Sequence, residues 1–212
     1  MRPKMGAQSQ QEMEKERAMA SDTQESPTTL NTRKIVVAGV LGAIAIVLGV
    51  TQWGFIPMPS GIQATIMHVP AIIGAVLEGP IVGILAGGIF GIFSMLQDTT
   101  GLFNNPLVSV VPRLLIGLTS WLVYRSLVKV NLDLAAAVAG VVGTLTNTIF
   151  VVGALVAFNL LPLAVVPTLI PNVIAEVVLA AVITPLVARG VNLVRSGRTS
   201  ATDTTPRDKS SF

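Results

Sequence analysis

The sequence predicts an all-α integral membrane protein with six transmembrane helices and with both termini in the cytoplasm. Two observations predict this class, a shortage of charge and the presence of long apolar runs. Hydrophobic residues make up 51% of the 212 residues and charged residues only 12%, whereas soluble domains are about 25% charged. The mean hydropathy is +0.73. Charged positions within residues 35–188 are few: Glu78, Asp98, Arg113, Arg125, Lys129, Asp133 and Glu176.

The chain is organised around two apolar runs, residues 63–77 and 81–96, which are joined by Glu-Gly-Pro at 78–80. As a helix with a rise of ~1.5 Å per residue, the first run spans only about 22 Å, less than the ~30 Å of a bilayer core. The second run has an almost bare helix face because it contains Gly83, Gly87, Gly88 and Gly91. In lipid, where no hydrophobic force drives helices together, such a face favours close packing. We therefore expect this hairpin to form the core of a helix bundle.

The first half of the chain begins with a polar segment, residues 1–31, which we expect to be a disordered cytoplasmic arm because it offers too little apolar surface to fold. The first span follows at residues 35–53. The next segment, residues 53–62, contains two prolines, a glycine and an aromatic pair, and this composition predicts a structured loop or cap.

The second half contains the remaining three spans after a polar turn at residues 98–105. The fourth span is expected from 106 or 107 to 128, and the fifth from 133 or 134 to about 158. Prolines interrupt residues 160–171, so the start of the sixth span stays open, although it continues to about residue 191. We expect one membrane domain at 32–194 and a disordered cytoplasmic tail at 195–212.

An even number of spans places both termini on one side, and the basic residues indicate which side. The loops expected at one end of the bundle, residues 53–62, 98–105 and 159–168, contain no Lys or Arg. The basic residues near the helix ends all fall at the other end: Arg33, Lys34, Arg125, Lys129, Arg189, Arg195 and Arg198. By the positive-inside rule this end is cytoplasmic. We expect a multi-pass protein of the cell inner (plasma) membrane.

The first span contains two overlapping pairs of small residues, Ala38 with Gly42 and Gly39 with Ala43. Residues four apart lie on one helix face, so each pair forms a flat strip that another helix can approach closely. The partner is either another helix of this chain or a separate subunit.

Placing an ionised side chain at membrane depth costs ~2.5–3.5 kcal/mol. Polar side chains at this depth therefore require a partner or a cavity. In this sequence they gather toward the outer half of the spans. The candidate ligand-binding residues are Trp53, Gln63, Asn104, Arg113, Asn147, Asn172 and Glu176.

Five of these candidates also have a purely structural interpretation. Arg113 either forms an ion pair with Glu176 or presents its planar guanidinium to an anionic or amide-bearing ligand. Asn147 and Asn172 have the alternative of bonding between helices, and Trp53 that of anchoring the chain at the membrane interface. His68 is interpreted as a packing residue.

The sequence also argues against several classes of protein. It contains no cysteine and a single histidine, so a metal site is not expected. We find no nucleophile elbow, no zinc-protease motif and no phosphate-binding glycine loop, so we expect neither an enzyme nor a cofactor. Nucleic acid is not an expected partner, because membrane topology explains the positions of the basic residues.

Several motifs, in order, resemble those of the substrate-binding S component of energy-coupling factor (ECF) vitamin transporters. They are AGVLG at 38–42, IPMPSGIQATIMHVPAIIGAVLEGP at 56–80, GGIFGIFSML at 87–96, VPRLLIGL at 111–118, GTLTNTIFVVG at 143–153 and NVIAE at 172–176. The resemblance covers about residues 32–194. The family's first helix usually carries Ala-x-x-x-Ala, and here the second position is Gly42, which keeps the surface flat.

The resemblance implies a six-helix subunit that captures a vitamin from outside and docks on a transmembrane T component carrying two ATPases. Docking is then assigned to Ala38, Gly39, Gly42 and Ala43. Pantothenate is the first choice of ligand, because Arg113 and the amide side chains suit a small carboxylate-bearing molecule. Hydroxymethylpyrimidine, folate, cobalamin and riboflavin stay open.

Three alternative functions are less consistent with the sequence. A self-contained secondary transporter predicts an internal repeat and coupling-ion residues at mid-membrane, and we see no convincing repeat. A membrane enzyme requires a paired nucleophile and base. A structural subunit without a ligand has no need for the polar set described above.

Overall fold

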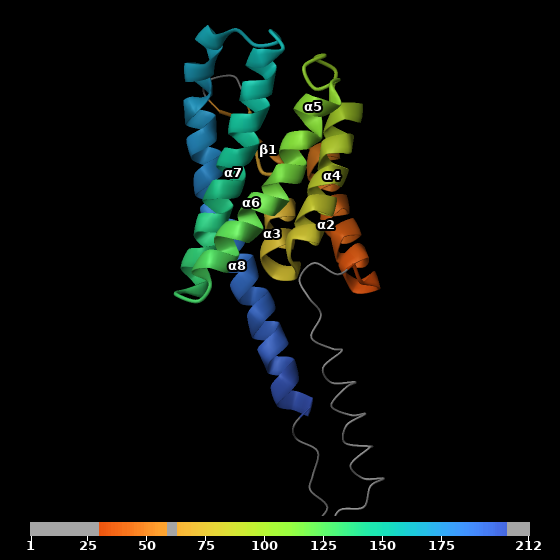
Figure 1. Cartoon of the computed structure of the whole chain (residues 1–212), viewed down its shortest axis with the longest axis vertical. Coiled ribbons are helices and arrows are strands. Elements are labelled where there is room, and N and C mark those ends of the chain that lie inside the picture. The colour runs from red at the N-terminus through yellow and green to blue at the C-terminus, as the bar shows by residue number, and fades with distance from the viewer. Residues whose placement is uncertain (1–29, 59–62, 203–212) are drawn as a thin grey trace, which may run out of the picture.

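The computed structural model describes residues 30–58 and 63–202, with side chains up to residue 195, and its helices pack side by side in an elongated bundle (Figure 1). Two shorter apolar helices, Val69–Glu78 and Pro80–Leu96, belong to this bundle. The helical segments long and apolar enough to cross a membrane, among the described residues, are Thr32–Val50, Pro106–Leu127, Leu132–Ala157 and Leu163–Arg195. The predicted helical membrane architecture is therefore confirmed. The arm expected at 1–31 lies outside the described residues except for its last two.

Helix α2 (Thr32–Val50) begins after Asn31, whose side-chain oxygen accepts a hydrogen bond from the backbone N–H of Arg33 at 3.4 Å. One face of α2 packs against α4 (Pro80–Leu96). The buried residues of this face include the small side chains Ala38, Gly42, Ala45 and Gly49. The lack of bulk lets the two helices approach closely.

Helices α3 (Val69–Glu78) and α4 form the predicted hairpin. Gly79, between them, has a φ of 101°, a backbone conformation that favours glycine. The prediction of a helical run from residue 63 is wrong, because α3 begins only at Val69. Pro70 explains the late start, since a residue without a backbone N–H is tolerated in the first helical turn but not in a helix interior.

The segment before α3 forms two short strands instead. Strand β1 (Phe55–Ile56) pairs antiparallel with β2 (Ala64–Thr65), with Phe55 opposite Thr65. The prediction of an all-α fold therefore requires this small correction. A structured connection between α2 and α3 was expected here, and residues 59–62 within it are outside the described residues.

Helix α6 (Val111–Leu127) crosses the glycine-rich face of α4 in close contact. The short helix α5 (Pro106–Ser109) precedes α6 and occupies the start of the predicted fourth span. A Cβ atom built on Gly87 would lie 2.2 Å from the carbonyl oxygen of Arg113, and one on Gly117 would lie 2.3 Å from the carbonyl carbon of Gly83. Backbone therefore packs directly on backbone between α4 and α6, as the bare glycine face predicts.

Two long helices complete the bundle. Helix α7 (Leu132–Ala157) agrees closely with the predicted fifth span and is capped by Asn131, whose side-chain oxygen accepts from two backbone N–H groups. The 3₁₀ helix η1 (Leu163–Leu169) leads into α8 (Ile170–Thr202). The sixth helix thus begins at Ile170, and it extends further than predicted. Helix α8 continues to Thr202, into the segment 195–212 that was expected to be a disordered tail.

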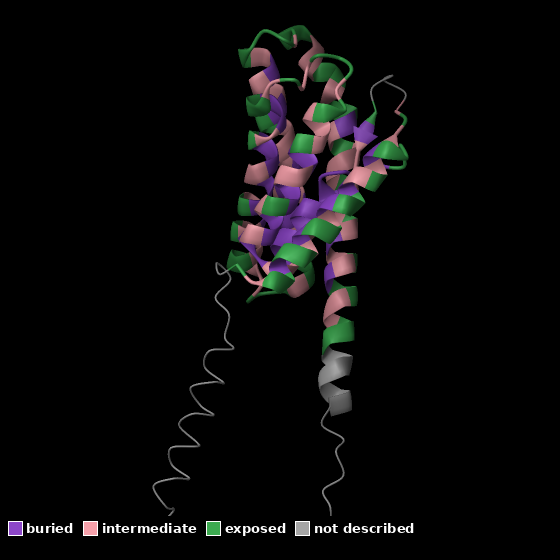
Figure 2. Cartoon of the chain, turned by 90° about the vertical axis from the view of Figure 1, so that its right-hand side faces the viewer, coloured by how far each residue is buried: buried purple, intermediate pink, exposed green. Residues whose placement is uncertain are grey.

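Seven of the ten residues of α3 are buried, and buried residues gather in the interior of the bundle (Figure 2). Ile72 of α3, Ile116 of α6, Ala139 of α7 and Ala180 of α8 belong to this buried core. Many large apolar side chains point outward along the helices instead, for example Val47, which is 57% exposed, and Leu186, which is 65% exposed. An apolar exterior around a small-residue core is the arrangement that a lipid environment favours.

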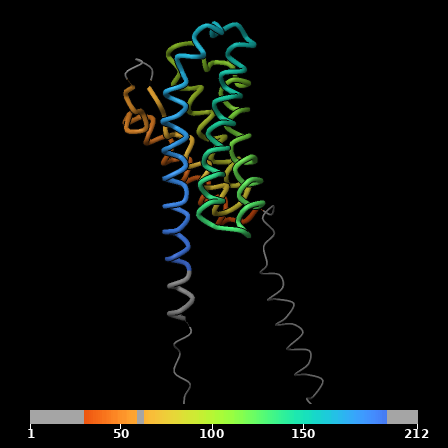
Figure 3. The backbone as a smooth tube through the Cα atoms, turned by 90° about the vertical axis from the view of Figure 1, so that its left-hand side faces the viewer, coloured from red at the N-terminus to blue at the C-terminus, as the bar shows by residue number. Residues whose placement is uncertain are grey.

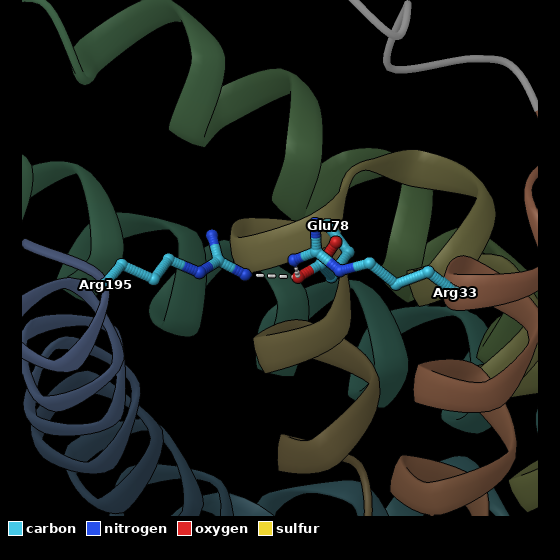
Figure 4. A network of polar contacts seen from close by, with 3 residues as sticks. All are labelled: Arg33, Glu78 and Arg195. Carbon is cyan, nitrogen blue, oxygen red and sulfur yellow. Dashed lines mark hydrogen bonds and ion pairs between the residues drawn. The ribbon is translucent and has the colours of Figure 1, made fainter. Parts of the chain in front are cut away.

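The two described ends of the chain lie at the same end of the bundle (Figures 1 and 3). Glu78, at the end of α3, holds them together. Its Oε1 accepts from the guanidinium of Arg33 at 2.7 Å and also from that of Arg195 (Figure 4). The start of α2 and the distal part of α8 are therefore tied to the α3–α4 hinge.

Candidate ligand-binding site

Arg113 lies in the first turn of α6 and is only 4% exposed. Its Nη1 donates to the carbonyl oxygen of Val108 at 2.7 Å. The guanidinium carbon lies 5.4 Å from the ring centroid of Phe90 and 5.2 Å from that of Phe103, so two aromatic faces stabilise the charge. The Arg113 Nε atom is buried without a hydrogen-bond partner among the described residues. This buried cation therefore retains an unused N–H donor.

Glu176 lies on α8 and binds the strand pair rather than Arg113. Its Oε1 accepts a hydrogen bond from the backbone N–H of Thr65 at 2.7 Å. The ion pair between Arg113 and Glu176, one of the two interpretations offered by the sequence, is not formed. Glu176 thus fastens β2 to α8 and keeps its second oxygen outside that bond.

His68 is fully buried just before α3, and its Nε2 lies 2.9 Å from the hydroxyl oxygen of Thr144 on α7. The Thr144 hydroxyl donates its one hydrogen to the carbonyl oxygen of Gly140 at 2.9 Å. Because that hydroxyl must then accept from the histidine, Nε2 carries the proton and Nδ1 carries the lone pair. Nδ1 has no hydrogen-bond partner among the described residues, so His68 offers a buried acceptor.

The two predicted asparagines lie one helical turn from residues already described, Asn147 from Thr144 and Asn172 from Glu176. Asn147 follows Thr144 by three residues on α7 and therefore shares its face. The Asn147 Oδ1 atom is buried and unpaired within the described part of the chain. Asn172, which is 5% exposed, precedes Glu176 by four residues on α8. By helix spacing, Asn147 therefore lies beside the Thr144–His68 contact, and Asn172 lies beside Glu176.

The other three candidates lie at the surface. The Trp53 side chain is 84% exposed, and Gln63 and Asn104 are exposed as well. They differ in exposure from Arg113 and Asn172, which are buried, and from Asn147 and Glu176, which are half-buried. A role for these three in ligand binding stays a prediction.

Four contributors to this region were missed in the sequence. Phe90 and Phe103 stack on the guanidinium, Thr65 supplies a backbone donor to Glu176, and Thr144 orients His68. Aromatic and hydroxyl side chains are common in apolar helices, so no local pattern distinguishes these four. Only the position of Thr144, three residues before Asn147, offered a signal.

The buried group can recognise a small polar molecule from several sides. Arg113 supplies charge and an N–H donor, while His68 Nδ1 and Asn147 Oδ1 supply acceptors. Buried polar atoms are costly unless they are paired, so a ligand that pairs them gains both affinity and specificity. No group of three or more His, Asp or Glu side chains that could hold a metal ion occurs within residues 30–58 and 63–202.

The four predicted docking residues divide between two faces of α2. Ala38 and Gly42 face α4, and a Cβ atom built on Gly42 would lie 2.7 Å from the Ile89 side chain. Gly39 and Ala43 are exposed, and a Cβ atom on Gly39 would meet nothing within 4 Å. Of the two alternatives left open by the sequence, an internal partner applies to the buried pair, Ala38 and Gly42, whereas Gly39 and Ala43 are accessible. Docking of a separate subunit on α2 stays a prediction.

Comparison with known proteins identifies both a family and individual relatives. Residues 33–188 match the family described as ECF transporter, substrate-specific component. The pantothenic acid transporter PanT of Lactococcus lactis subsp. cremoris (strain MG1363) is 24% identical over 192 residues, covering 76% of this chain and 95% of the relative. The pantothenate transporter PanT of Leuconostoc mesenteroides subsp. mesenteroides is 32% identical over 98 residues, covering 41% of this chain and 48% of the relative.

Proposed function

Because the chain belongs to the family of ECF transporter substrate-specific components, we propose that it captures pantothenate outside the cell for ATP-driven uptake. The observation that carries this proposal is the similarity to two proteins named as pantothenate transporters, one of them matched over 95% of its length. In the proposed cycle the loaded subunit docks on a T component that carries two ATPase subunits. The T component and the ATPases then move the vitamin inward.

The chemistry of the buried group supports pantothenate as the ligand. Pantothenate carries a carboxylate, an amide and two hydroxyl groups. In our proposal Arg113 binds the carboxylate through its unused donor, and the acceptors on His68 and Asn147 receive hydrogen bonds from the hydroxyl or amide groups. Asn172 and Glu176 are proposed to line the opposite wall. Charge-assisted hydrogen bonds of this kind are the stronger ones, and a buried setting strengthens them further.

The proposed orientation places the termini in the cytoplasm, with six helices crossing the plasma membrane. In this arrangement α3 and α4 count as spans although α3 has only 10 residues. The absence of Lys and Arg from the opposite loops supports the orientation. The buried ligand group, at the start of α6 and α8, then lies in the outer half of the membrane.

One vesicle experiment tests both the ligand and the orientation. The chain is expressed without a T component or ATPases, and radiolabelled pantothenate is added to right-side-out or inverted membrane vesicles. We expect saturable binding to the right-side-out vesicles, and binding to the inverted ones only after permeabilisation. Unlabelled pantothenate should displace the label, whereas riboflavin, folate, cobalamin and hydroxymethylpyrimidine should not.

The possible failures of this experiment are distinguishable. Binding confined to sealed inverted vesicles would reverse the orientation but keep the ligand. Displacement by another vitamin would replace pantothenate as the substrate. Accumulation of label inside the vesicles against a gradient, with no ATPase present, would favour the self-contained secondary transporter.

Docking on the T component is proposed to use the exposed pair of α2, Gly39 and Ala43. We expect Gly39→Leu to abolish assembly with the T component while leaving pantothenate affinity unchanged, because the new side chain projects away from the bundle. Gly42→Leu should instead destabilise the isolated subunit, because its Cβ atom would collide with Ile89. The measurements are co-purification with the T component and calorimetric binding of pantothenate.

The matched control for docking is Gly153→Leu, since Gly153 on α7 also has nothing within 4 Å of a built Cβ atom. This variant should assemble normally if α2 provides the docking surface. Normal assembly by the Gly39 variant would remove α2 from the interface. Equal loss in both variants would indicate a general effect of bulky side chains.

A further inference from the structure

A cavity of about 380 Å³ lies at the end of the bundle where α2 begins and α3 ends. Its polar lining comes from Lys34, Glu78, Tyr124 and Arg125, with Trp121 forming part of the wall. This cavity is separate from the buried group around Arg113, which belongs to the start of α6 rather than to its end. The proposed vitamin uptake gives it no role.

The cavity has an excess of positive charge. Its single carboxylate, Glu78, is already bonded by two guanidinium groups, those of Arg33 and Arg195 (Figure 4). Lys34, only 5% exposed, and Arg125 add two further cations to the lining. An anion entering the cavity therefore meets two lining cations, Lys34 and Arg125, and a carboxylate whose charge is offset by Arg33 and Arg195.

The aromatic residues hold one of these cations in place. The Arg125 guanidinium carbon lies 5.5 Å from the ring centroid of Trp121, so stacking restrains the planar fork. Tyr124, on the same helix, places a phenol in the lining. A planar guanidinium paired with a compact ammonium is a combination well suited to phosphate, whose oxygens accept several hydrogen bonds at once.

The surroundings of the cavity are those of a membrane interface. Tryptophan and tyrosine concentrate at the headgroup level, and large exposed apolar side chains follow the lining residues directly in the sequence on α2 and α6. Ile35 and Val36, which follow Lys34, are 54% and 58% exposed, and Leu122, which follows Trp121, is 51% exposed. These three exposed side chains, here called the apolar rim, offer contacts for acyl chains on the same two helices that carry Lys34 and Arg125.

We propose that this cavity binds the phosphate headgroup of an anionic phospholipid. Basic pockets between helix ends favour such headgroups, and each basic residue near the surface contributes to the attraction. A lipid satisfies both features of the site at once, because its phosphate enters the cavity while its chains lie on the apolar rim. A soluble phosphate or a carboxylate of a partner protein would use only the charge.

The experiment uses tryptophan fluorescence of the full chain. The sequence contains two tryptophans, so Trp53→Phe leaves Trp121 as the sole reporter within the cavity wall. The protein is placed in phosphatidylcholine nanodiscs that contain increasing fractions of brominated phosphatidylglycerol or brominated phosphatidylcholine. We expect half-maximal quenching at a fraction of phosphatidylglycerol about tenfold lower than that of phosphatidylcholine, because two lining cations favour the anionic lipid.

Two variants and one control locate the effect. Lys34→Gln and Arg125→Gln should each reduce the preference for phosphatidylglycerol at least threefold. Arg189→Gln should leave the preference unchanged, because Arg189 contacts Asp133 at 3.8 Å and is not part of the cavity. Retained pantothenate binding by each variant, or a wild-type circular dichroism spectrum and melting curve, verifies that it is folded.

Four outcomes would overturn the proposal. The first is equal quenching by the two lipids, and the second is an unchanged preference in both cavity variants. The third is full reversal of quenching by soluble glycerol phosphate at millimolar concentration, which would make the ligand a free phosphate. The fourth is equal competition by brominated oleate, which would assign the cavity to carboxylates and so to an acidic side chain of a partner. None of these outcomes depends on which vitamin the subunit carries.

Discussion

Alanine in place of Gly117 is expected to prevent α4 and α6 from packing and to cause one of the largest losses of stability among single methyl additions in the bundle. The added Cβ atom would lie 2.3 Å from the carbonyl carbon of Gly83 and 2.4 Å from the backbone nitrogen of Ile84. Both neighbours are backbone atoms, which cannot rotate away as a side-chain tip can. The helices must then separate along their whole contact. We therefore expect the free energy of unfolding to fall by about 3 kcal/mol or more, at the upper end of overpacking effects.

The measurement for Gly117→Ala is the midpoint of thermal unfolding in detergent, followed by size-exclusion chromatography. Gly153→Ala on α7 is the control, since it adds the same methyl group where nothing lies within 4 Å. The control should unfold at the wild-type midpoint or slightly above it, because alanine is the better helix former. A Gly117 variant as stable as this control would mean that α4 and α6 do not pack as closely as the structure indicates.

Replacement of Arg113 by lysine is expected to cause the largest loss of ligand affinity. Lysine keeps the positive charge but loses the planar fork, which at once bonds Val108, stacks on Phe90 and Phe103 and presents a free Nε donor. We expect the Kd for pantothenate to rise roughly 10- to 100-fold, corresponding to about 1.5–3 kcal/mol for a lost charge-assisted hydrogen bond. Isothermal titration calorimetry on the purified variant provides the measurement.

The Glu176→Gln variant serves as the comparison for Arg113→Lys. The amide oxygen of glutamine can still accept from the Thr65 N–H, so the strand pair should stay attached to α8 and affinity should fall less than tenfold. Because no direct ion pair joins the two residues, the free-energy effects in the double variant should add within about 0.5 kcal/mol. Strong coupling would indicate that the ligand bridges the two side chains. Wild-type affinity in a folded Arg113→Lys variant would remove Arg113 from the ligand site.

The positions of the long helices were predictable from the sequence because length and apolarity are local properties. The fifth span, expected at 133–158, is observed as Leu132–Ala157, and the glycine face of residues 81–96 does pack on a neighbouring backbone. The predicted helix boundaries were wrong where the sequence allowed more than one local structure. Residues 63–68 were expected to be helical but form β2 and a turn; Pro70 limits the helix after them, and Thr65 in β2 bonds to Glu176, a residue 111 positions away.

The side-chain partners in the candidate site could not be predicted from the sequence, because they also lie far apart in it. The cost of burying Arg113 and Glu176 indicates that each needs a partner, and both have one. Which partner each finds depends on distances between helices. Arg113 meets Phe90 and Phe103 from α4 and its following turn, while Glu176 meets a backbone N–H of β2.

The sequence by itself determined that this chain is a helical membrane protein of the substrate-specific component family. Hydropathy, charge near the helix ends and the order of motifs are properties of the linear sequence and need no knowledge of tertiary contacts. Only the tertiary structure decided which small residues of α2 stay accessible. The spacing of four places Ala38 with Gly42 and Gly39 with Ala43 on adjacent helix faces, and both faces are equally flat. Ile89 of α4 covers Gly42 and leaves Gly39 exposed. The rotation of α2 about its own axis decides which of the two faces is covered, and packing against the neighbouring helices sets that rotation.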